Sequence, residues 1–487
     1  MSKIKFVDTT VRDGHQSLWA MNMRTHHMLS VLPHLDTAGF EGIEFVNGGA
    51  GFKKLVRDLR ENPWDWINKG TAIAKNTPLR WHGPFSGRTL SGYIPQEVGE
   101  LRIKRAVELG IRHVRTSNNW NDYSVMSEEK KRFDTLGMSP IINLIYSVSP
   151  RHTDEYYVKK AVEASALNPY HLCFKDVGGL LTPERIRDLV PKILDATPGV
   201  IWEFHGHCNN GLGPVNAIEC ARLGINILHT AVPPLANANS LPSIFNLSSN
   251  LRVVEFEVDI NNESLNPASE YLKSVADQEH FKVGMPYEYD HRFYLHQIPG
   301  GMISSLQHQL TAVGMGDRID EVLDEVPQVR ADLGYPIMVT PLSQIVGIQA
   351  AINVITQDRY SQVTDQTIEY ALGRHGIEAP SLIDKNVLDK ILNRPRAVEL
   401  KALKPWEPTL AELRSKYGRN ITDEDLTLLA IVGDDALDVV GAGGSKKQYL
   451  NKSKPLADLL REIALNGNHR SYEIANNEFV LKVVSRQ

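Results

Sequence analysis

The chain has 487 residues, of which 42% are hydrophobic and 23% charged, which is enough for a large core and more than one domain. Its formal net charge is -5, whereas binding to nucleic acid or to an anionic membrane requires an excess of basic residues. No apolar run approaches the roughly 18 residues of a membrane span, and the N-terminus lacks the charged-then-apolar pattern of a signal peptide. Three cysteines are too few for a disulfide framework, so we expect a cytoplasmic protein.

The first half of the sequence alternates strand-like and helix-like segments. Eight such units of about 30 residues each predict a (β/α)8 barrel. The alternative, a doubly wound open sheet, would normally have fewer units and a glycine-rich turn after its first strand. No such turn is present, so the pattern favours the barrel. The expected strands are residues 4–8, 42–46, 79–82, 111–116, 141–147, 171–175, 201–205 and 225–230.

This alternation stops near residue 235. Residues 245–400 are mostly helical in pattern, with polar or glycine-rich inserts at residues 296–302 and 339–344. Residues 395–408 contain prolines and lysines and mark a boundary. Residues 440–447 superficially resemble a phosphate-binding loop but lack its strand-to-helix context, so we expect a linker or turn. We therefore expect an α/β protein in three parts: a catalytic (β/α)8 TIM barrel over residues 1–240, a mostly helical, funnel-like domain over residues 241–400 that completes the active site, and a small C-terminal extension over residues 401–487, for which one interpretation is a role in assembly.

Polar side chains gather where the expected strands end, which in a barrel enzyme is the catalytic face. His205 and His207 are two positions apart on one strand, so both imidazoles point to the same face. Together with an oxygen ligand, they suit zinc, manganese or cobalt. Such histidine pairs also occur on ordinary strands. Asp13 and Lys175 also end strands of the same barrel, and this favours a metal site.

Lys175 has two interpretations. A protonated ammonium repels a cation, so Lys175 could be a salt-bridge partner of Asp176 or Asp13. Alternatively, its neutral amine is carbamylated by carbon dioxide and becomes a carboxylate-like ligand. The residues alone leave both interpretations open.

Five segments, in order along the chain, resemble the carboxyltransferase domain of pyruvate carboxylase, the oxaloacetate decarboxylase alpha subunit and the transcarboxylase 5S subunit. The barrel is also similar to the wider group that holds hydroxymethylglutaryl-CoA lyase and isopropylmalate synthase. The Gln-Ile-Pro-Gly-Gly and Val-Thr-Pro-x-Ser segments, however, belong to the biotin-dependent branch. The five segments are residues 8–17, 174–182, 205–207, 297–302 and 339–347.

The resemblance implies a role for each matching residue. Arg12 and Gln16 would line the substrate pocket. Thr340 would shuttle a proton between biotin N1 and the acceptor carbon; without the resemblance, it reads as a turn hydroxyl before Pro341. Arg12, Lys175 and Thr340 would be the catalytic residues. The metal ligands would be Asp13, carbamylated Lys175, His205 and His207.

The sequence departs from the family pattern on one rim of the barrel. Aligning on Gly92-Tyr93 places Ser86 where the family has an arginine that holds the acceptor carboxylate. After the fourth strand, Arg-Val-Phe-Asp becomes Arg115-Thr-Ser-Asn118, and the turn after the second strand is one residue longer. Arg88 and Tyr93 are the remaining candidates for substrate binding on this loop.

Two outcomes of this departure remain open. Arg88 could restore the lost charge, or the pocket could accept a larger or less acidic molecule, with Trp81, His82 and Phe85 as its walls. We expect pyruvate and oxaloacetate to be poor substrates.

The sequence contains no Ala-Met-Lys-Met biotin-attachment motif and no segment for a biotin carboxylase. We therefore expect biotin on a separate carrier protein, a separate biotin carboxylase subunit, and a homodimer or larger assembly. The expected function is transfer of a carboxyl group between carboxybiotin and an enolisable carbonyl acceptor. The alternatives are a metal-dependent lyase or Claisen-type condensing enzyme without biotin, and an inactive relative. Residues 297–302 and 339–347 argue against the first alternative, and Asp13, His205 and His207 argue against the second.

Overall fold

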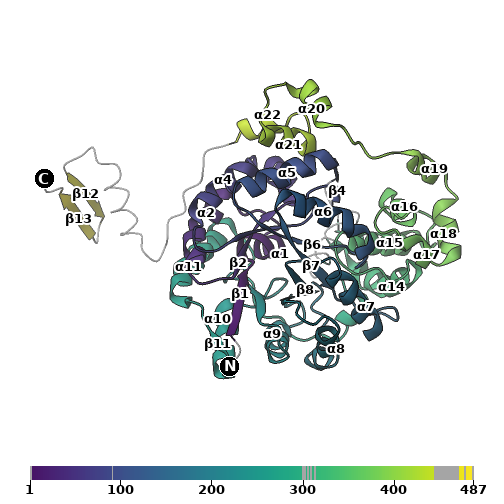
Figure 1. The fold of residues 1–487 in the computed structure, drawn as a ribbon, viewed down its shortest axis with the longest axis horizontal. Helices are drawn as coiled ribbons and strands as arrows, with labels where there is room; N and C mark the ends of the chain where they lie inside the picture. Colours follow the sequence, from purple (N-terminus) through teal and green to yellow (C-terminus); the bar gives the residue numbers. More distant parts are fainter. Residues whose placement is uncertain are drawn as a thin grey trace.

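The computed structural model describes residues 3–89, 92–298, 303, 306–307, 310–311, 314–443, 471–476 and 479–484. Parallel strands form a closed barrel, in which β10 pairs with β1 and Phe6 lies opposite Leu228 (Figure 1). The predicted (β/α)8 barrel is confirmed. In order around the barrel, its strands are β1 (Lys3–Asp8), β2 (Gly42–Asn47), β3 (Leu79–His82), β6 (His113–Thr116), β7 (Ser139–Ile145), β8 (His171–Asp176), β9 (Trp202–Gly206) and β10 (Ile227–Thr230).

Helices surround the barrel and begin at residues that favour a helix start. The side chains of Thr153 and Thr182 accept hydrogen bonds from the backbone of the first turn that follows, and Pro183 occupies the first position of its helix. The longer helices are α2 (Thr25–Asp36), α4 (Pro63–Ile73), α5 (Gln96–Glu108), α6 (Ser127–Leu136), α7 (Asp154–Ser165), α8 (Pro183–Ala196), α9 (Gly213–Arg222), α10 (Ile244–Val253) and α11 (Asn262–Glu279). The shorter ones are η1 (Thr10–Gly14), α1 (His15–Leu18), α3 (Ala50–Lys54), η2 (Leu55–Leu59) and η3 (Tyr123–Met126).

Two small strand pairings next to the barrel strands were not predicted. β4 (Gly87–Thr89) and β5 (Gly92–Ile94) form an antiparallel hairpin between β3 and α5. β11 (Glu257–Val258) pairs with the start of β1, outside the barrel. Runs of two or three residues are too short to show the alternation by which a strand is recognised.

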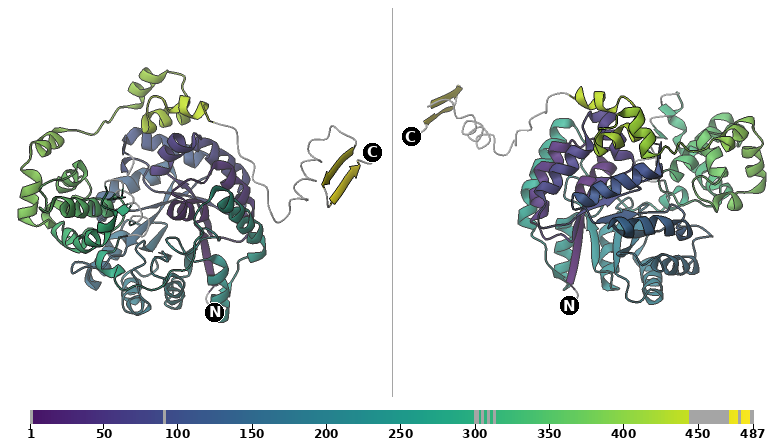
Figure 2. Two further views of the ribbon diagram at one scale, coloured as in Figure 1. Left: turned by 180° about the vertical axis from the view of Figure 1, so that it is seen from behind. Right: turned by 45° about the horizontal axis from the view of Figure 1, so that its top comes forward.

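A second group of helices lies beside the barrel (Figures 1 and 2). It has its own hydrophobic core, which includes Trp120 from the connection after β6. Trp120 stacks on Tyr370 with ring centroids 6.0 Å apart, and Arg151, after β7, pairs with Glu378 at 2.6 Å. These contacts fix the group to the barrel connections that follow β6 and β7. Its elements are α12 (Phe293–His296), η4 (Gly316–Arg318), α14 (Ile319–Asp332), α15 (Leu342–Thr356), α16 (Asp365–Ala371), α17 (Ala379–Leu382), α18 (Lys385–Leu392) and α19 (Pro395–Ala402).

The next three helices return to the barrel and share its core. Trp64 Nε1 donates to Thr427 Oγ1 at 2.9 Å, and Arg105 Nε pairs with Glu424 at 2.8 Å. The glycine-rich stretch begins at the end of the last of these helices, which includes residues 440 and 441, and residues 442 and 443 follow that helix. Residues 444–447 of the stretch lie outside the described residues. These helices are α20 (Leu410–Tyr417), α21 (Asp423–Val432) and α22 (Ala436–Gly441), and an antiparallel pair, β12 (Ser471–Asn476) and β13 (Phe479–Val484), follows.

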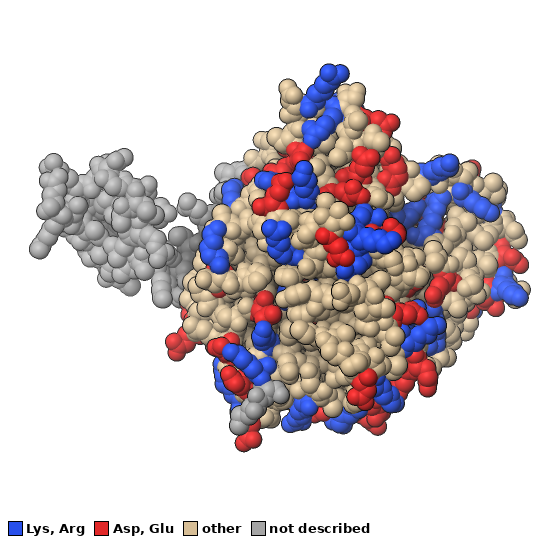
Figure 3. Space-filling view, in the orientation of Figure 1, with Lys and Arg blue, Asp and Glu red and all other residues tan. Residues whose placement is uncertain are grey.

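Charges of both signs are intermingled on the face shown in Figure 3, in keeping with totals of 53 Lys and Arg and 58 Asp and Glu. None of the helices in the described part of the chain is long and apolar enough to cross a membrane. The division into parts at residues 240 and 400 remains a prediction.

Candidate active site

The first strand delivers its polar residues through a tight turn. β1 ends at Asp8, and η1 then carries Arg12 and Asp13, both buried. Gly14 closes this turn, where a Cβ would lie 2.9 Å from the carbonyl oxygen of Leu235. The close approach of the two backbones therefore fixes where Asp13 can lie.

Asp13, His205 and His207 converge on one point. His205 Nε2 lies 3.2 Å from both Asp13 Oδ2 and His207 Nε2, and His207 Nε2 lies 3.6 Å from Asp13 Oδ2. Ligands about 2.0–2.1 Å from a tetrahedral metal lie about 3.3 Å from one another. Lone pairs that converge in this way repel one another unless a cation or a shared proton lies among them. The donor set and its spacing therefore fit a divalent cation.

His207 has a fixed orientation. Its Nδ1 donates to the carbonyl oxygen of Asn239 at 2.7 Å, so in the neutral imidazole Nε2 carries no proton and can bind a cation. Asp13 is held as an anion: burial would raise its pKa, but Arg12 holds it well below the usual range.

Lys175 lies beside His205, because the two residues are direct partners in the pairing of β8 with β9. Burial lowers the pKa of Lys175 to about 7, and the nearby cations of Arg115 and Arg12 act in the same direction. Both carboxylates that could pair with Lys175 have other partners. Asp13 pairs with Arg12 at 2.8 Å, and Asp176 accepts hydrogen bonds from the backbone of Leu180 and Leu181.

Glu44 on β2 lies between two buried arginines. Arg12 Nε donates to Glu44 Oε2 at 2.8 Å, and Arg115 Nη2 donates to the same oxygen at 3.0 Å. Arg12 is also paired with Asp13. The charges of these two arginines and two carboxylates thus balance one another.

The predicted substrate-binding residues occupy different surroundings. The side chain of Gln16 accepts a hydrogen bond from Asn47 at the end of β2, at 2.8 Å. Arg88 and Tyr93 lie on the β4–β5 hairpin, where Arg88 pairs with Glu369 of α16 at 2.9 Å and Tyr93 donates to Glu407. Arg12 lies at the mouth with Asp13, whereas Arg88 contacts α16 and Tyr93 contacts the segment between residues 402 and 410.

The apolar walls expected from the loop after β3 are not available. Trp81 and Phe85 are 0% and 1% exposed and stack on each other with ring centroids 4.3 Å apart. Arg102 of α5 lies over Trp81 and donates to the carbonyl oxygen of Phe85. The expectation that these two rings line a pocket is therefore wrong, because both pack against the helices outside the barrel. His82 remains partly exposed at the end of β3.

Thr340 is exposed and precedes α15. Its neighbours Ile337 and Val339 pack on Ile145, the last residue of β7, and on Val177, directly after β8. Asn119 Nδ2 donates to the carbonyl oxygen of Thr340 at 3.3 Å. The segment therefore lies over the strand ends. Gln297, of the other family segment, donates from its amide to the carbonyl oxygen of Val148 at 2.8 Å, while residues 299–302 lie outside the described residues.

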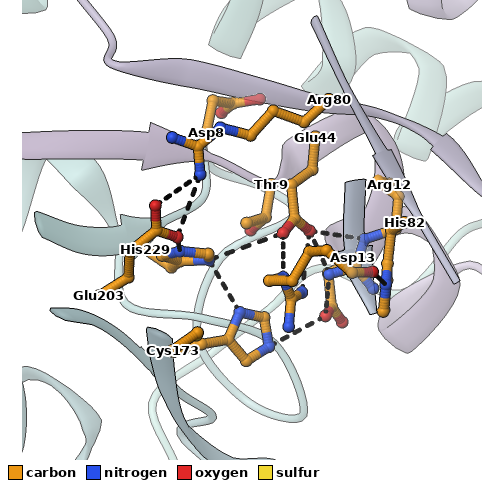
Figure 4. Close-up of polar contacts among 12 residues, drawn as sticks. Asp8, Thr9, Arg12, Asp13, Glu44, Arg80, His82, Cys173, Glu203 and His229 are labelled. Carbon is orange, nitrogen blue, oxygen red and sulfur yellow. Dashed lines mark hydrogen bonds and ion pairs between the residues drawn. The ribbon is translucent and has the colours of Figure 1, made fainter. Parts of the chain in front are cut away.

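Sequence reasoning missed three buried residues beneath these ligands: Arg80, Glu203 and His229 (Figure 4). Arg80 on β3 pairs with Glu203 on β9 at 2.9 Å, although the two strands are not neighbours, so both side chains point into the barrel. Glu203 lies two residues before His205, so the strand alternation that puts His205 and His207 on one face puts Glu203 on the same face. The same reasoning applied one step toward the start of the strand would have found this residue.

A closed parallel barrel whose mouth gathers two imidazoles, a carboxylate and a lysine defines a (β/α)8-barrel enzyme with a candidate divalent-cation site. A family profile described as a conserved carboxylase domain matches residues 293–467. The chain is 33% identical over 465 residues to a pyruvate carboxylase subunit of Methanocaldococcus jannaschii, covering 94% of this chain and 81% of that protein.

Two further relatives carry other names. The 2-oxoglutarate carboxylase large subunit of Hydrogenobacter thermophilus is 32% identical, with 90% of this chain and 68% of that protein covered. The methylmalonyl-CoA carboxyltransferase 5S subunit of Propionibacterium freudenreichii subsp. shermanii is 28% identical, with 88% and 86% covered. The fold matches the carboxyl transferase domain of Rhizobium etli pyruvate carboxylase with a TM-score of 0.80 at 21% identity, over 100% of this chain and 84% of that one. The chain belongs to the family of biotin-dependent carboxyltransferases, and it is an enzyme of that class.

Proposed function

We propose that the chain transfers a carboxyl group between carboxybiotin on a separate carrier protein and an enolisable carbonyl acceptor held at the barrel mouth. The observation that carries the proposal is the position of the Thr340 segment over the ends of β7 and β8. Lys175 is on β8, and its neighbour β9 carries His205. The Thr340 hydroxyl, which we assign to proton transfer, would then belong to the same mouth as the proposed cation ligands.

The cation would be zinc, with manganese or cobalt as alternatives, and its ligands would be Asp13, His205, His207 and carbamylated Lys175. When bound, such a cation supplies a Lewis acid that stabilises an enolate. The charges of the site support this arrangement, because Arg12 and Arg115 are already balanced by Asp13 and Glu44. A divalent cation together with one carbamate would add a single positive charge to these groups, which suits an anionic acceptor.

Carbamylation needs a neutral amine, and burial provides it at Lys175 by lowering its pKa to about 7. The lone pair of Nζ attacks the carbon of carbon dioxide, a nitrogen–carbon bond forms, and one proton leaves to solvent. The product is an anion that Arg12 and Arg115 no longer repel, whereas a protonated Lys175 would add to their charge.

Thr340 would carry the proton. In the carboxylation direction, the acceptor carbon loses a proton to biotin N1 through the Thr340 hydroxyl, while the N1–carboxyl bond breaks and a carbon–carbon bond forms. Arg12 would stabilise the charge that develops on the acceptor. Its contacts with Glu44 and Asp13 use Nε and Nη2, so we assign its Nη1 to the acceptor.

The names of the relatives do not settle the acceptor, since they refer to pyruvate, 2-oxoglutarate and methylmalonyl-CoA. We propose an acceptor other than pyruvate or oxaloacetate, because Ser86 replaces the family's arginine and Arg88 is paired with Glu369. Each of these relatives is named as one subunit of its enzyme, which supports separate biotin carboxylase and carrier subunits as partners. A homodimer or larger assembly and a cytoplasmic location remain part of the proposal.

The proposal is tested by Thr340→Ala and Thr340→Ser in the complex with its biotinylated carrier. Thr340→Ala should abolish carboxyl transfer with its metal content unchanged, because Thr340 is assigned to the proton and not to the cation. Thr340→Ser, which keeps the hydroxyl, should retain activity. Full activity of Thr340→Ala, or turnover without any biotinylated protein, would instead support a lyase or condensing enzyme.

A further inference from the structure

The two candidate histidine ligands are held in different ways. His207 donates to a backbone carbonyl, that of Asn239. His205 makes its outer contact with another imidazole: its Nδ1 lies 3.0 Å from Nδ1 of His229 on β10. A carbonyl can only accept a proton, but an imidazole nitrogen can accept or donate. The tautomer of His205 therefore depends on the proton positions of His229.

His229 has a second partner deeper in the barrel. Its Nε2 lies 2.8 Å from Glu203 Oε2 (Figure 4). Glu203 also receives hydrogen bonds from Arg80 at 2.9 Å and from His171 at 2.7 Å. Glu203 and His205 are 0% exposed and His229 is 1% exposed, so the contacts from Arg80 to the candidate metal site are shielded from bulk solvent.

This series of contacts also helps to explain why a glycine, Gly42, is present on β2. A Cβ at Gly42 would overlap the guanidinium of Arg80, so this position leaves the space through which Arg80 crosses the barrel. Arg80 is 1% exposed and its partner is completely buried. A carboxylate that faces a buried guanidinium stays ionised and can only accept hydrogen bonds.

The acceptor role of Glu203 fixes the proton on Nε2 of His229. If His229 is neutral, its Nδ1 has no proton and accepts one from Nδ1 of His205, which leaves Nε2 of His205 bare. In the competing arrangement, His229 carries protons on both nitrogens, partly balanced by Glu44 Oε1 at 3.8 Å. His205 would then accept at Nδ1 and carry its own proton on Nε2, where it would block a cation.

We propose that His229 and Glu203 are positioning residues that hold the imidazole of His205 with its Nε2 directed at Asp13 and His207, because a cation at that nitrogen excludes the competing arrangement. This role rests on the proposed cation site. Among the described residues, His205 is thus held by side chains that can be replaced, whereas His207 is held by a backbone carbonyl.

The test measures zinc affinity by competition with a chromogenic chelator. His229→Leu should weaken zinc binding about 10- to 100-fold, as is usual for the partners of ligating histidines. His229→Gln should recover most of the affinity, because its carbonyl can accept from His205 while its amide donates to Glu203.

His171→Leu is the matched control. His171 is also a buried histidine that bonds to Glu203, but it has no contact with His205. This variant should leave the zinc affinity unchanged. Equal losses in His171→Leu and His229→Leu, or no recovery in His229→Gln, would show that only general packing of the barrel interior matters and would contradict the proposal. A wild-type protein that binds no zinc would refute the proposed cation site and this role with it, whereas normal zinc binding by both wild type and His229→Leu would refute the positioning role alone.

Discussion

Glu44 maintains the charge balance of the barrel mouth, because it is the shared partner of Arg12 and Arg115. Burial would raise its pKa, but the two arginines hold that pKa well below the usual range. Both arginines are almost completely buried, so neither can turn to water if the carboxylate is lost. At the scale of single residues, this triad should be the most sensitive point of the fold.

Glu44→Gln should therefore lower the free energy of unfolding by about 3–5 kcal/mol, the usual cost of leaving a buried charge without its partner. Glu128→Gln is the control, since Glu128 pairs with Lys131 on the surface, where an ion pair contributes at most about 1 kcal/mol. Urea denaturation of both metal-free variants measures the difference. Equal effects of the two substitutions would show that the triad does not contribute as we describe.

At the scale of elements, the β4–β5 hairpin connects the barrel to the helical part through Arg88 and Glu369. Ser86 aligns with the position where the family has an arginine. Arg88 can take the role of that arginine only by breaking its ion pair with Glu369. The loss of a charge-assisted pair typically costs about 2–5 kcal/mol. This corresponds to roughly 30- to 5,000-fold weaker binding of a 2-oxo acid such as pyruvate.

We therefore expect pyruvate and oxaloacetate to be poor substrates of the reconstituted complex when several acceptors are compared by kcat/KM. If Arg88 is paired with Glu369 and does not bind the acceptor, Arg88→Ala should change the ranking of the acceptors by kcat/KM little. Efficient pyruvate turnover that collapses in Arg88→Ala would show that this arginine binds the acceptor. Efficient turnover that survives the substitution would show that the alignment of the loop is wrong.

The connection between β7 and α7 makes stability sensitive to acid. Burial, together with Arg330 and Arg151, lowers the pKa of His152 from 6.5 to about 3. The unfolded chain therefore binds a proton below pH 6.5 that the folded chain does not, and stability falls as the pH decreases from about 6.5 to 3. The contribution of His152 at pH 5 is a loss of about 2 kcal/mol, at about 1.4 kcal/mol per pH unit.

His152→Gln should reduce this loss, so that the difference in unfolding free energy between about pH 7 and pH 5 becomes smaller than in the wild type. Urea denaturation at both pH values measures it. The other buried histidines contribute to both proteins and cancel in the comparison. An unchanged pH dependence would mean that His152 is protonated in the folded protein or accessible to water.

At the scale of the whole molecule, the sequence predicted the barrel because each strand ends in a clear polar or glycine signal. It also predicted the His205 and His207 pair, whose spacing shows directly which face they share. It did not predict that Arg80 reaches Glu203, because that contact depends on closure of the barrel and joins strands far apart in the chain. The burial of Trp81 was missed for a related reason, since alternation shows that a side chain is on one face but not which face points outward.

Metal analysis of the purified chain will show whether the mouth of the barrel holds a divalent cation on Asp13, His205 and His207. The wild-type protein should contain close to one zinc, manganese or cobalt ion per chain, and His207→Ala, which removes one ligand, should contain almost none while remaining folded. An active wild-type protein without metal, or a His207→Ala variant with full metal content, would show that these residues do not hold a cation.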